Sequence, residues 1–209
     1  AKEGFLGRII TTAATADLLE PMLQDSARIQ EDDAERLSRR ALRKGGEPVE
    51  PIYTTKDVDA VLPFIDRGPY GHVMDTGRGF RCRFIDAGHI LGSGSLELWF
   101  PGTAGEKKIV FSGDIGKKGN PIINDPTLAT EADYVVMEST YGDRLHKNPE
   151  ETANELAEAV STTFQKGGNV IIPAFAIGRT QDILYLLNRL VREGTLPKLT
   201  VYIDSPLAE

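Results

Sequence analysis

An alternation of apolar and polar residues between Gly79 and Phe111 is the feature that most constrains the fold of this chain. The stretches FRCRF (80–84) and SLELWF (95–100) each repeat with a period of two, and KIVFSGD (108–114) follows a Pro-Gly turn. Side chains of a strand point to opposite faces in turn, so this pattern predicts antiparallel strands with one face in a core. Cys82 belongs to the apolar set, which predicts a buried small residue, whereas Glu97 and Trp99 fall on the polar face.

The last third of the chain alternates strand and helix patterns. Strands are expected at ADYVVMES (132–139), which reads as buried, at NVIIPAF (169–175) and at LTVYID (199–204). A helix is expected between them, with Asn148 as N-cap and Gly167 just past its end, and a second helix covers 179–194. This order is typical of an α/β fold.

In the first third of the chain, the pattern predicts a strand over 8–12 and then a long helix. Its N-cap candidates are Thr15 and Asp17, and it stops at Gly45-Gly46. A short helix is expected from Thr55 or Lys56. Near its end the long helix carries a basic face, which we interpret as solvated and paired with the acidic residues just before it. The cations are Arg36, Arg39, Arg40, Arg43 and Lys44. The acids are Glu31, Asp32, Asp33 and Glu35.

Charge and cysteine content limit the classes of function. The 209 residues include 24 Lys and Arg against 31 Asp and Glu, a net charge of −7, so a polyanion must be bound locally, by a metal or a small basic patch. One cysteine excludes an internal disulfide framework and fits a reducing compartment, and we expect a cytoplasmic protein without a membrane span. The start AKEGFLG lacks methionine, and we expect a fragment of a longer protein.

Three strands end in a small-residue turn at the point where a titratable side chain appears. These ends are FIDAGHILGSG (84–94), IVFSGDIG (109–116) and YVVMESTYG (134–142), with His89, Asp114 and Glu138. A single histidine beside apolar residues is more often structural, and a Gly-Asp pair after a strand is more often a turn. Together they suggest imidazole and carboxylate ligands of a hydrolytic zinc site. Gly88 and the Gly92-Ser93-Gly94 turn would let His89 leave the sheet, with Ile90 and Leu91 as anchors of the loop in the core.

The ordered set AGHILGSGSLEL, KIVFSGDIG, ESTYGDRLH and GGNVIIPAFAIGRTQDILYLL resembles the RNA-processing branch of the metallo-β-lactamase fold that carries a β-CASP domain. The similarity extends over essentially the whole chain. It implies an α/β (αββα) fold, with 1–145 as part of a metallo-β-lactamase four-layer sandwich and 146–209 as the start of an inserted β-CASP domain.

The resemblance also implies roles for individual residues. His89 is similar to a histidine that binds one zinc ion, and Asp114 to an aspartate that bridges two. Glu138 is similar to an acidic residue that orients a histidine supplied later in such chains. The implied activity is hydrolysis of RNA phosphodiester bonds by a metal-bound hydroxide, with two Zn²⁺ ions per complete site. Arg179, Ser139 and Thr140 are the implied substrate-binding residues.

One departure from the family pattern is prominent. The motif His-x-His-x-Asp-His does not occur, and His72 and His146 fit neither its spacing nor its context. We therefore expect the chain alone to bind zinc poorly and to be inactive, with the activity residing in the full-length parent.

Two alternatives to the ribonuclease are weighed, of which only the first stays open, and two further points are undecided. The first alternative is a metal-free scaffold subunit of an RNA-processing complex, against which the presence of both His89 and Asp114 argues. The second, a nucleotide-binding domain, fails because ESTYGDRLHKNP stands where a Gly-x-Gly-x-x-Gly turn would be needed. Cleavage from an end or internally, and a homodimer, both remain open.

Overall fold

The computed structural model describes residues 2–145 and 147–208. The chain divides into two compact units, Ala1–Glu138 and Ser139–Glu209. Each unit has its own arrangement of helices, and the candidate site residues His89, Asp114 and Glu138 all belong to the first. The assignment of 1–145 and 146–209 to two named domains stays a prediction.

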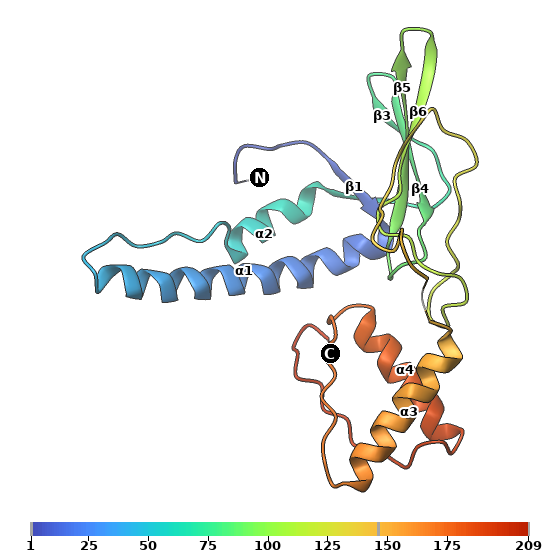
Figure 1. Cartoon of the computed structure of the whole chain (residues 1–209). Helices are drawn as coiled ribbons and strands as arrows, with labels where there is room; N and C mark the ends of the chain where they lie inside the picture. The colour runs from blue at the N-terminus through green and yellow to red at the C-terminus, as the bar shows by residue number, and fades with distance from the viewer. Residues whose placement is uncertain (1, 146, 209) are drawn as a thin grey trace. The chain divides into compact units, whose positions relative to one another are not determined.

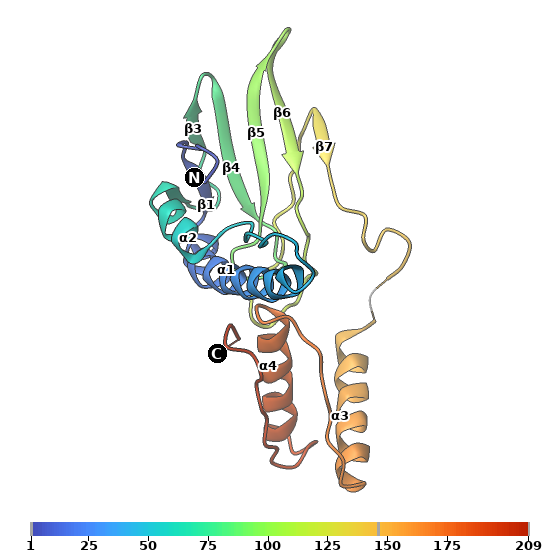
Figure 2. The same cartoon turned by 90° about the vertical axis from the view of Figure 1, so that its left-hand side faces the viewer.

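A five-stranded sheet in the order β3-β4-β5-β6-β7 forms the centre of the first unit, as Figure 2 shows. β3 to β6 pair antiparallel, whereas β7 pairs parallel with β6. The strands are β3 (Met74–Gly77), β4 (Phe80–Asp86), β5 (Gly94–Gly102), β6 (Gly105–Phe111) and β7 (Tyr134–Val136). The antiparallel strands and the hairpin turn after Gly102 confirm the period-two prediction. β7 forms where a strand was predicted, but its residues are exposed rather than buried.

The polar face of the sheet, on which the alternation places Glu97, is covered at this residue. Its side chain is 1% exposed and makes ion pairs with Arg83 on β4 and with Lys108 Nζ on β6, the latter at 2.5 Å. Burial by itself raises the pKa of the Glu97 carboxyl, but the hydrogen bonds and charges of Arg83 and Lys108 outweigh it and leave the pKa below its ordinary value. A carboxylate paired across two strands can thus be buried on the face that the pattern marked as polar.

Trp99 lies on the same face as Glu97, and cations surround its ring. The charged groups of Arg81, Arg83 and Lys108 lie 5.2–5.6 Å from the ring centroid. On the opposite face Cys82 is buried as predicted, and burial raises the pKa of its thiol.

A long helix and a short parallel strand pair complete the first unit. α1 (Ala13–Leu42) follows β1 (Ile9–Thr12), which pairs with β2 (Ile65–Gly68); α2 (Thr55–Val61) and the 3-10 turn η1 (Leu62–Phe64) lie between α1 and β2 in the chain. Figure 1 shows α2 beside α1 and the far end of α1 directed away from the sheet. The N-cap is Thr12, whose Oγ1 accepts the Thr15 N–H at 3.2 Å. The prediction that Thr15 or Asp17 is the N-cap was wrong, because Thr12 is both the last residue of β1 and the N-cap of α1.

Two helices pack together in the second unit. α3 (Pro149–Gln165) begins after the predicted N-cap Asn148, and α4 spans Arg179–Arg192. Their core consists of Ala157, Val160, Leu187, Leu190 and Leu196. This confirms the two predicted helices.

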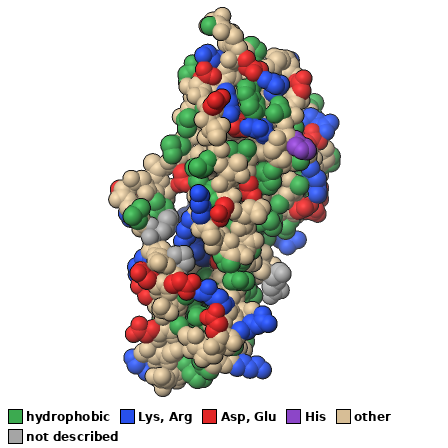
Figure 3. All heavy atoms as spheres, turned by 90° about the vertical axis from the view of Figure 1, so that its right-hand side faces the viewer, with side chains coloured by type: hydrophobic (Ala, Val, Ile, Leu, Met, Phe, Trp, Pro, Cys, Tyr) green, Lys and Arg blue, Asp and Glu red, His purple; other side chains and the backbone are tan. Residues whose placement is uncertain are grey.

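The segments 169–175 and 199–204 were predicted as strands, and this prediction was wrong for the chain as it stands. Neither forms a strand, and Ile171 and Tyr202 are 91% and 89% exposed. A strand needs a neighbour to satisfy its backbone groups, and in the described part of the chain these segments pair with none. Figure 3 shows green hydrophobic side chains at the surface among charged ones.

The fold class is therefore mixed α/β, as expected. The four-layer sandwich stays a prediction. None of the helices in the described residues combines the length and apolarity that crossing a membrane requires.

Candidate functional site

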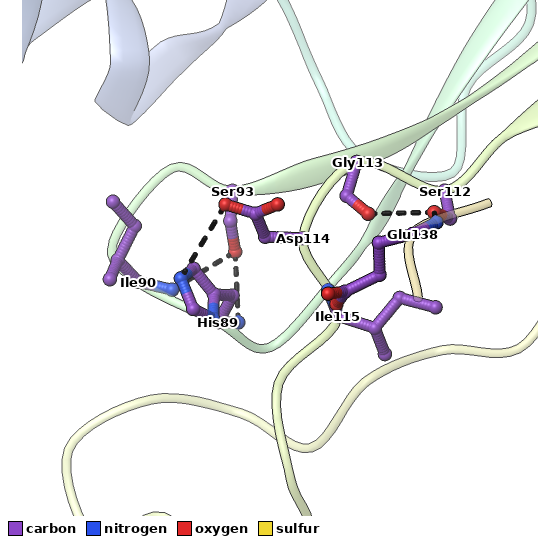
Figure 4. Close-up of polar contacts among 8 residues, drawn as sticks. All are labelled: His89, Ile90, Ser93, Ser112, Gly113, Asp114, Ile115 and Glu138. Carbon is purple, nitrogen blue, oxygen red and sulfur yellow. Dashed lines mark hydrogen bonds and ion pairs between the residues drawn. The ribbon is translucent and has the colours of Figure 1, made fainter. Parts of the chain in front are cut away.

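His89 lies on a tight loop that joins β4 to β5, shown in Figure 4. The Ser93 hydroxyl oxygen accepts the His89 N–H at 3.0 Å and the Ile90 N–H at 3.2 Å. The Ser93 N–H in turn donates to the Ile90 carbonyl at 3.0 Å. One serine thus fixes the backbone that presents the histidine.

Two glycines give this loop its path, as the sequence predicted. Gly88 has φ +60° and Gly92 has φ +85°, values that favour glycine. The expected anchoring by Ile90 and Leu91 is wrong, since their side chains are 37% and 58% exposed. Contacts between the loop backbone and the start of α1 hold the loop instead.

Those contacts converge on the carbonyl of Gly92. It accepts hydrogen bonds from the Thr12 hydroxyl at 2.7 Å and from the Thr15 hydroxyl at 2.9 Å. A Cβ on Gly92 would lie 2.7 Å from the backbone nitrogen of Thr15, so only glycine fits against the first turn of α1. The N-terminus of α1 and the histidine loop are therefore one packed element.

Asp114 lies on the loop after β6, and Ser112 ties the base of this loop to the neighbouring strands. The Ser112 N–H donates to the Val136 carbonyl at 2.9 Å, and the Ser95 hydroxyl donates to the Ser112 carbonyl at 2.6 Å. The Ser112 hydroxyl accepts the Glu138 N–H at 3.0 Å. These bonds link β5, β6 and the end of β7.

Glu138 supports the same loop through its carboxylate. Its Oε1 accepts the backbone N–H of Ile115, the residue after Asp114, at 2.7 Å (Figure 4). A charge-assisted bond to the main chain at this point limits the movement of the Asp114 backbone. In this chain Glu138 thus acts on the aspartate loop; its expected action on a later histidine stays a prediction.

The two loops touch through their backbones. The Gly116 N–H donates to the Ala87 carbonyl at 2.8 Å. A Cβ on Gly116 would lie 1.6 Å from the Gly88 carbonyl oxygen, so any larger residue there would force the loops apart. The loops of His89 and Asp114 are consequently positioned by each other.

His89 and Asp114 converge across this contact, as expected from their strand ends. The distance from His89 Nε2 to Asp114 Oδ2 is 3.9 Å, with side chains 43% and 72% exposed. Zn–N and Zn–O bonds are about 2.0–2.2 Å long, so both atoms can bind one ion placed between them. The exposure of both side chains leaves the pair open to further ligands.

The donor chemistry fits zinc, but the number of donors in the described residues does not complete a site. Residues 2–145 and 147–208 contain no group of three or more His, Cys, Asp and Glu side chains that could hold a metal ion. Zinc sites use three or four protein ligands. His72 is exposed, and His146 lies outside the described residues. His89 and Asp114 would be two ligands of a larger set.

The remaining predicted residues belong to the second unit. Ser139 opens a turn in which its carbonyl accepts the Gly142 N–H at 3.0 Å, and Thr140 lies within that turn. Arg179 is exposed at the first position of α4. Their substrate contacts stay predictions.

The Thr180 side chain does not cap α4, although threonine at the start of a helix is a common capping residue. Its hydroxyl donates to the Phe175 carbonyl at 2.8 Å, and the Gly178 N–H donates to Gln181 Oε1 at 2.7 Å.

The sequence interpretation missed Thr12, Thr15 and Ser112 as supports of the site, and it named Ser93 only as part of the turn after His89. Ser93 had a local signal, because a serine between two glycines after a histidine is a frequent turn residue. The threonines had none, because they lie some 80 residues before the carbonyl that they bind.

Comparison with known proteins gives this geometry its context. The chain is 34% identical over 207 residues to the ribonuclease TTHA0252 of Thermus thermophilus. This alignment covers 99% of the chain and 42% of that ribonuclease. The chain is 36% identical over 158 residues to an RNase J-like protein of Methanocaldococcus jannaschii, covering 74% and 37%. It is 33% identical over 212 residues to the transcription termination factor FttA of Thermococcus kodakarensis, covering 98% and 30%.

The chain belongs to the β-CASP ribonuclease family. It spans less than half the length of each of these three relatives. A scan against models of protein families finds no match.

Proposed function

We propose that the protein to which this chain belongs is a zinc-dependent ribonuclease that hydrolyses RNA phosphodiester bonds. The observation that carries the proposal is the approach of His89 Nε2 to within 3.9 Å of Asp114 Oδ2, on two loops that fix each other. Relatives named as a ribonuclease and an RNase J-like protein support RNA as the substrate.

Each residue of the site has a distinct task in this proposal. His89 and Asp114 each supply one side-chain donor, and the remaining donors come from outside the described residues. Glu138 holds the Ile115 N–H and thereby keeps Asp114 directed at His89. Zinc, when bound, would lower the pKa of water and neutralise charge on the phosphodiester. In the complete site the Asp114 carboxylate would be a ligand shared by two zinc ions.

The second unit would contact the substrate. Arg179, at the exposed start of α4, would bind a phosphate oxygen together with the N–H groups of the first helical turn. Ser139 and Thr140 would line the approach to Glu138. Neither internal cleavage nor cleavage from an end is favoured by these residues.

The test uses the whole protein with a 5′-labelled single-stranded RNA. Substituting His89→Ala or Asp114→Asn should lower the zinc content measured by mass spectrometry and reduce cleavage by at least about 100-fold. His72→Ala, which changes an exposed histidine outside the site, is the matched control and should leave both unchanged. Full zinc content and full cleavage in the His89→Ala, Asp114→Asn double variant would refute the proposal.

The competing function is a metal-free scaffold subunit. It would be favoured by a whole protein that binds RNA, contains no zinc after purification with zinc, and does not cleave. The 209-residue chain alone should show low zinc affinity and no cleavage in the same assays. A homodimer stays a prediction that analytical ultracentrifugation tests directly.

A further inference from the structure

Basic residues gather at the end of α1 and in the two residues that follow it. Five cations and no acidic residue occur between positions 36 and 46. We call Arg36, Arg39, Arg40, Arg43 and Lys44 the basic tip. The whole chain has a net charge of −7, so the basic tip is a local reversal of the overall charge.

The basic tip lies on the side of α1 that does not pack on the rest of the first unit. The packed side includes Ala34, which is 6% exposed, Ser38, whose hydroxyl accepts the Val49 N–H at 2.7 Å, and Glu31, which accepts the Thr55 N–H at 3.2 Å. At 100° per residue, Arg36 and Arg43 are turned by roughly 160–180° from Ala34. Both arginines are exposed.

Only part of this charge is neutralised. Arg36 pairs with Asp33 at 2.7 Å and Arg39 with Glu35 at 2.9 Å, which confirms the expected pairing for two of the five cations. Arg40, Arg43 and Lys44 have no ion pair within the described ranges. Four of the arginines also line an open hollow on the helix surface, together with Asp32 and Glu35.

Stabilisation of the helix end does not account for the whole basic tip. Cations favour the last turn of a helix because they face the negative end of its dipole, and this effect falls off within one turn. Only Arg39 and Arg40 lie in the last turn of α1. Arg36 precedes it, and Arg43 and Lys44 follow the end of the helix at Leu42.

We propose that the basic tip binds the phosphate backbone of RNA, away from the His89 and Asp114 loops. This inference rests on the proposed function, which makes RNA the substrate. Arg36 and Arg43 are about 10 Å apart along the helix axis, at about 1.5 Å per residue, which suits contact with successive phosphates rather than one isolated anion. The cations contact phosphate groups and not the base edges, so they add affinity for RNA without a sequence preference.

The test measures binding of the full 209-residue chain to a labelled single-stranded RNA by fluorescence anisotropy over a series of salt concentrations. The variant R40Q/R43Q/K44Q should bind about tenfold more weakly near 0.1 M salt, and the slope of log K against log salt should become shallower by about 2. The control K166Q/R192Q/K198Q removes the same charge from exposed residues of the second unit and should match the unmodified chain.

Circular dichroism of both variants checks that they are folded, and a poly-glutamate peptide serves as an acidic competitor. Unchanged affinity in R40Q/R43Q/K44Q, an equal loss in both variants, or tighter binding of poly-glutamate than of RNA would each overturn the inference. Binding is measured without cleavage, so a whole protein that fails to cleave RNA refutes the proposed function and leaves this result standing.

Discussion

The two ends of α1 are held in opposite ways. At its N-terminus Thr12 is 3% exposed and donates a hydrogen bond to the Gly92 carbonyl, while the helix backbone packs directly against the histidine loop. At its C-terminus Arg40, Arg43 and Lys44 are exposed, with no ion pair in the part of the chain that the structure describes.

The difference shows how one helix can serve two purposes. Buried hydroxyl and backbone contacts specify one geometry, and they suit an end that must keep His89 in place. Exposed arginine and lysine side chains do little to fix the position of the helix end, but they remain available to an anionic partner. Substitutions at the first end should therefore cost stability, and those at the second should cost binding alone.

The largest effect is expected for Gly92→Ala. Its Cβ would meet Thr15 N and Oγ1 at 2.7 Å, and φ +85° is strained for alanine, so the free energy of unfolding should fall by about 3 kcal/mol in urea denaturation. Gly119→Ala is the control, because φ is +78° but no atom lies within 4 Å, and it should cost only about 1 kcal/mol. Equal losses in the two variants would show that the packing of α1 on the loop is unimportant.

A smaller effect is expected for Thr12→Ala. This change removes the N-cap of α1 and one of the two bonds to the Gly92 carbonyl, and it should cost about 2 kcal/mol. Thr12→Ser should retain most of the stability because it keeps the hydroxyl. Thr11→Ala is the matched control, since the Thr11 hydroxyl donates only to the adjacent carbonyl of Thr12. If Thr11→Ala is as destabilising as Thr12→Ala, the cap carries no special role.

The smallest effect on stability is expected at the other end of α1. R40Q/R43Q/K44Q should change the free energy of unfolding by less than about 1 kcal/mol, because it removes exposed charges and, near the helix end, one favourable dipole contact. The same urea denaturation measures it. A loss as large as that of Thr12→Ala would mean that the basic tip is structural, and the contrast between the two ends would fail.

Local patterns predicted the hairpins and helices well. The strands β4, β5 and β6 follow a period-two alternation and pair with their sequence neighbours, so local information suffices for them. The segments 169–175 and 199–204 are also rich in apolar and β-branched residues, as strands are. A strand that follows a helix pairs with a distant part of the chain, and no local pattern supplies that partner. Glu97 shows a further limit: alternation tells which residues share a face, and not which face is covered.

The candidate site was predicted in part for the same reason. Strand ends marked by glycine brought His89 and Asp114 together, and the distance between them has the expected size. Their supports, Thr12 and Ser112, act through hydrogen bonds to distant backbone groups, which a single sequence does not reveal. The N-cap at Thr12 was missed because the residue also belongs to a strand pattern.

The length of α1 sets a scale for any RNA that touches both of its ends. The helix spans Ala13–Leu42, which is about 45 Å at about 1.5 Å per residue. A stacked strand advances about 3.4 Å per nucleotide, so about 13 nucleotides are needed to reach from the basic tip to the histidine loop. RNAs shorter than this threshold should be bound at one end only, and their affinity should be insensitive to charge at the other.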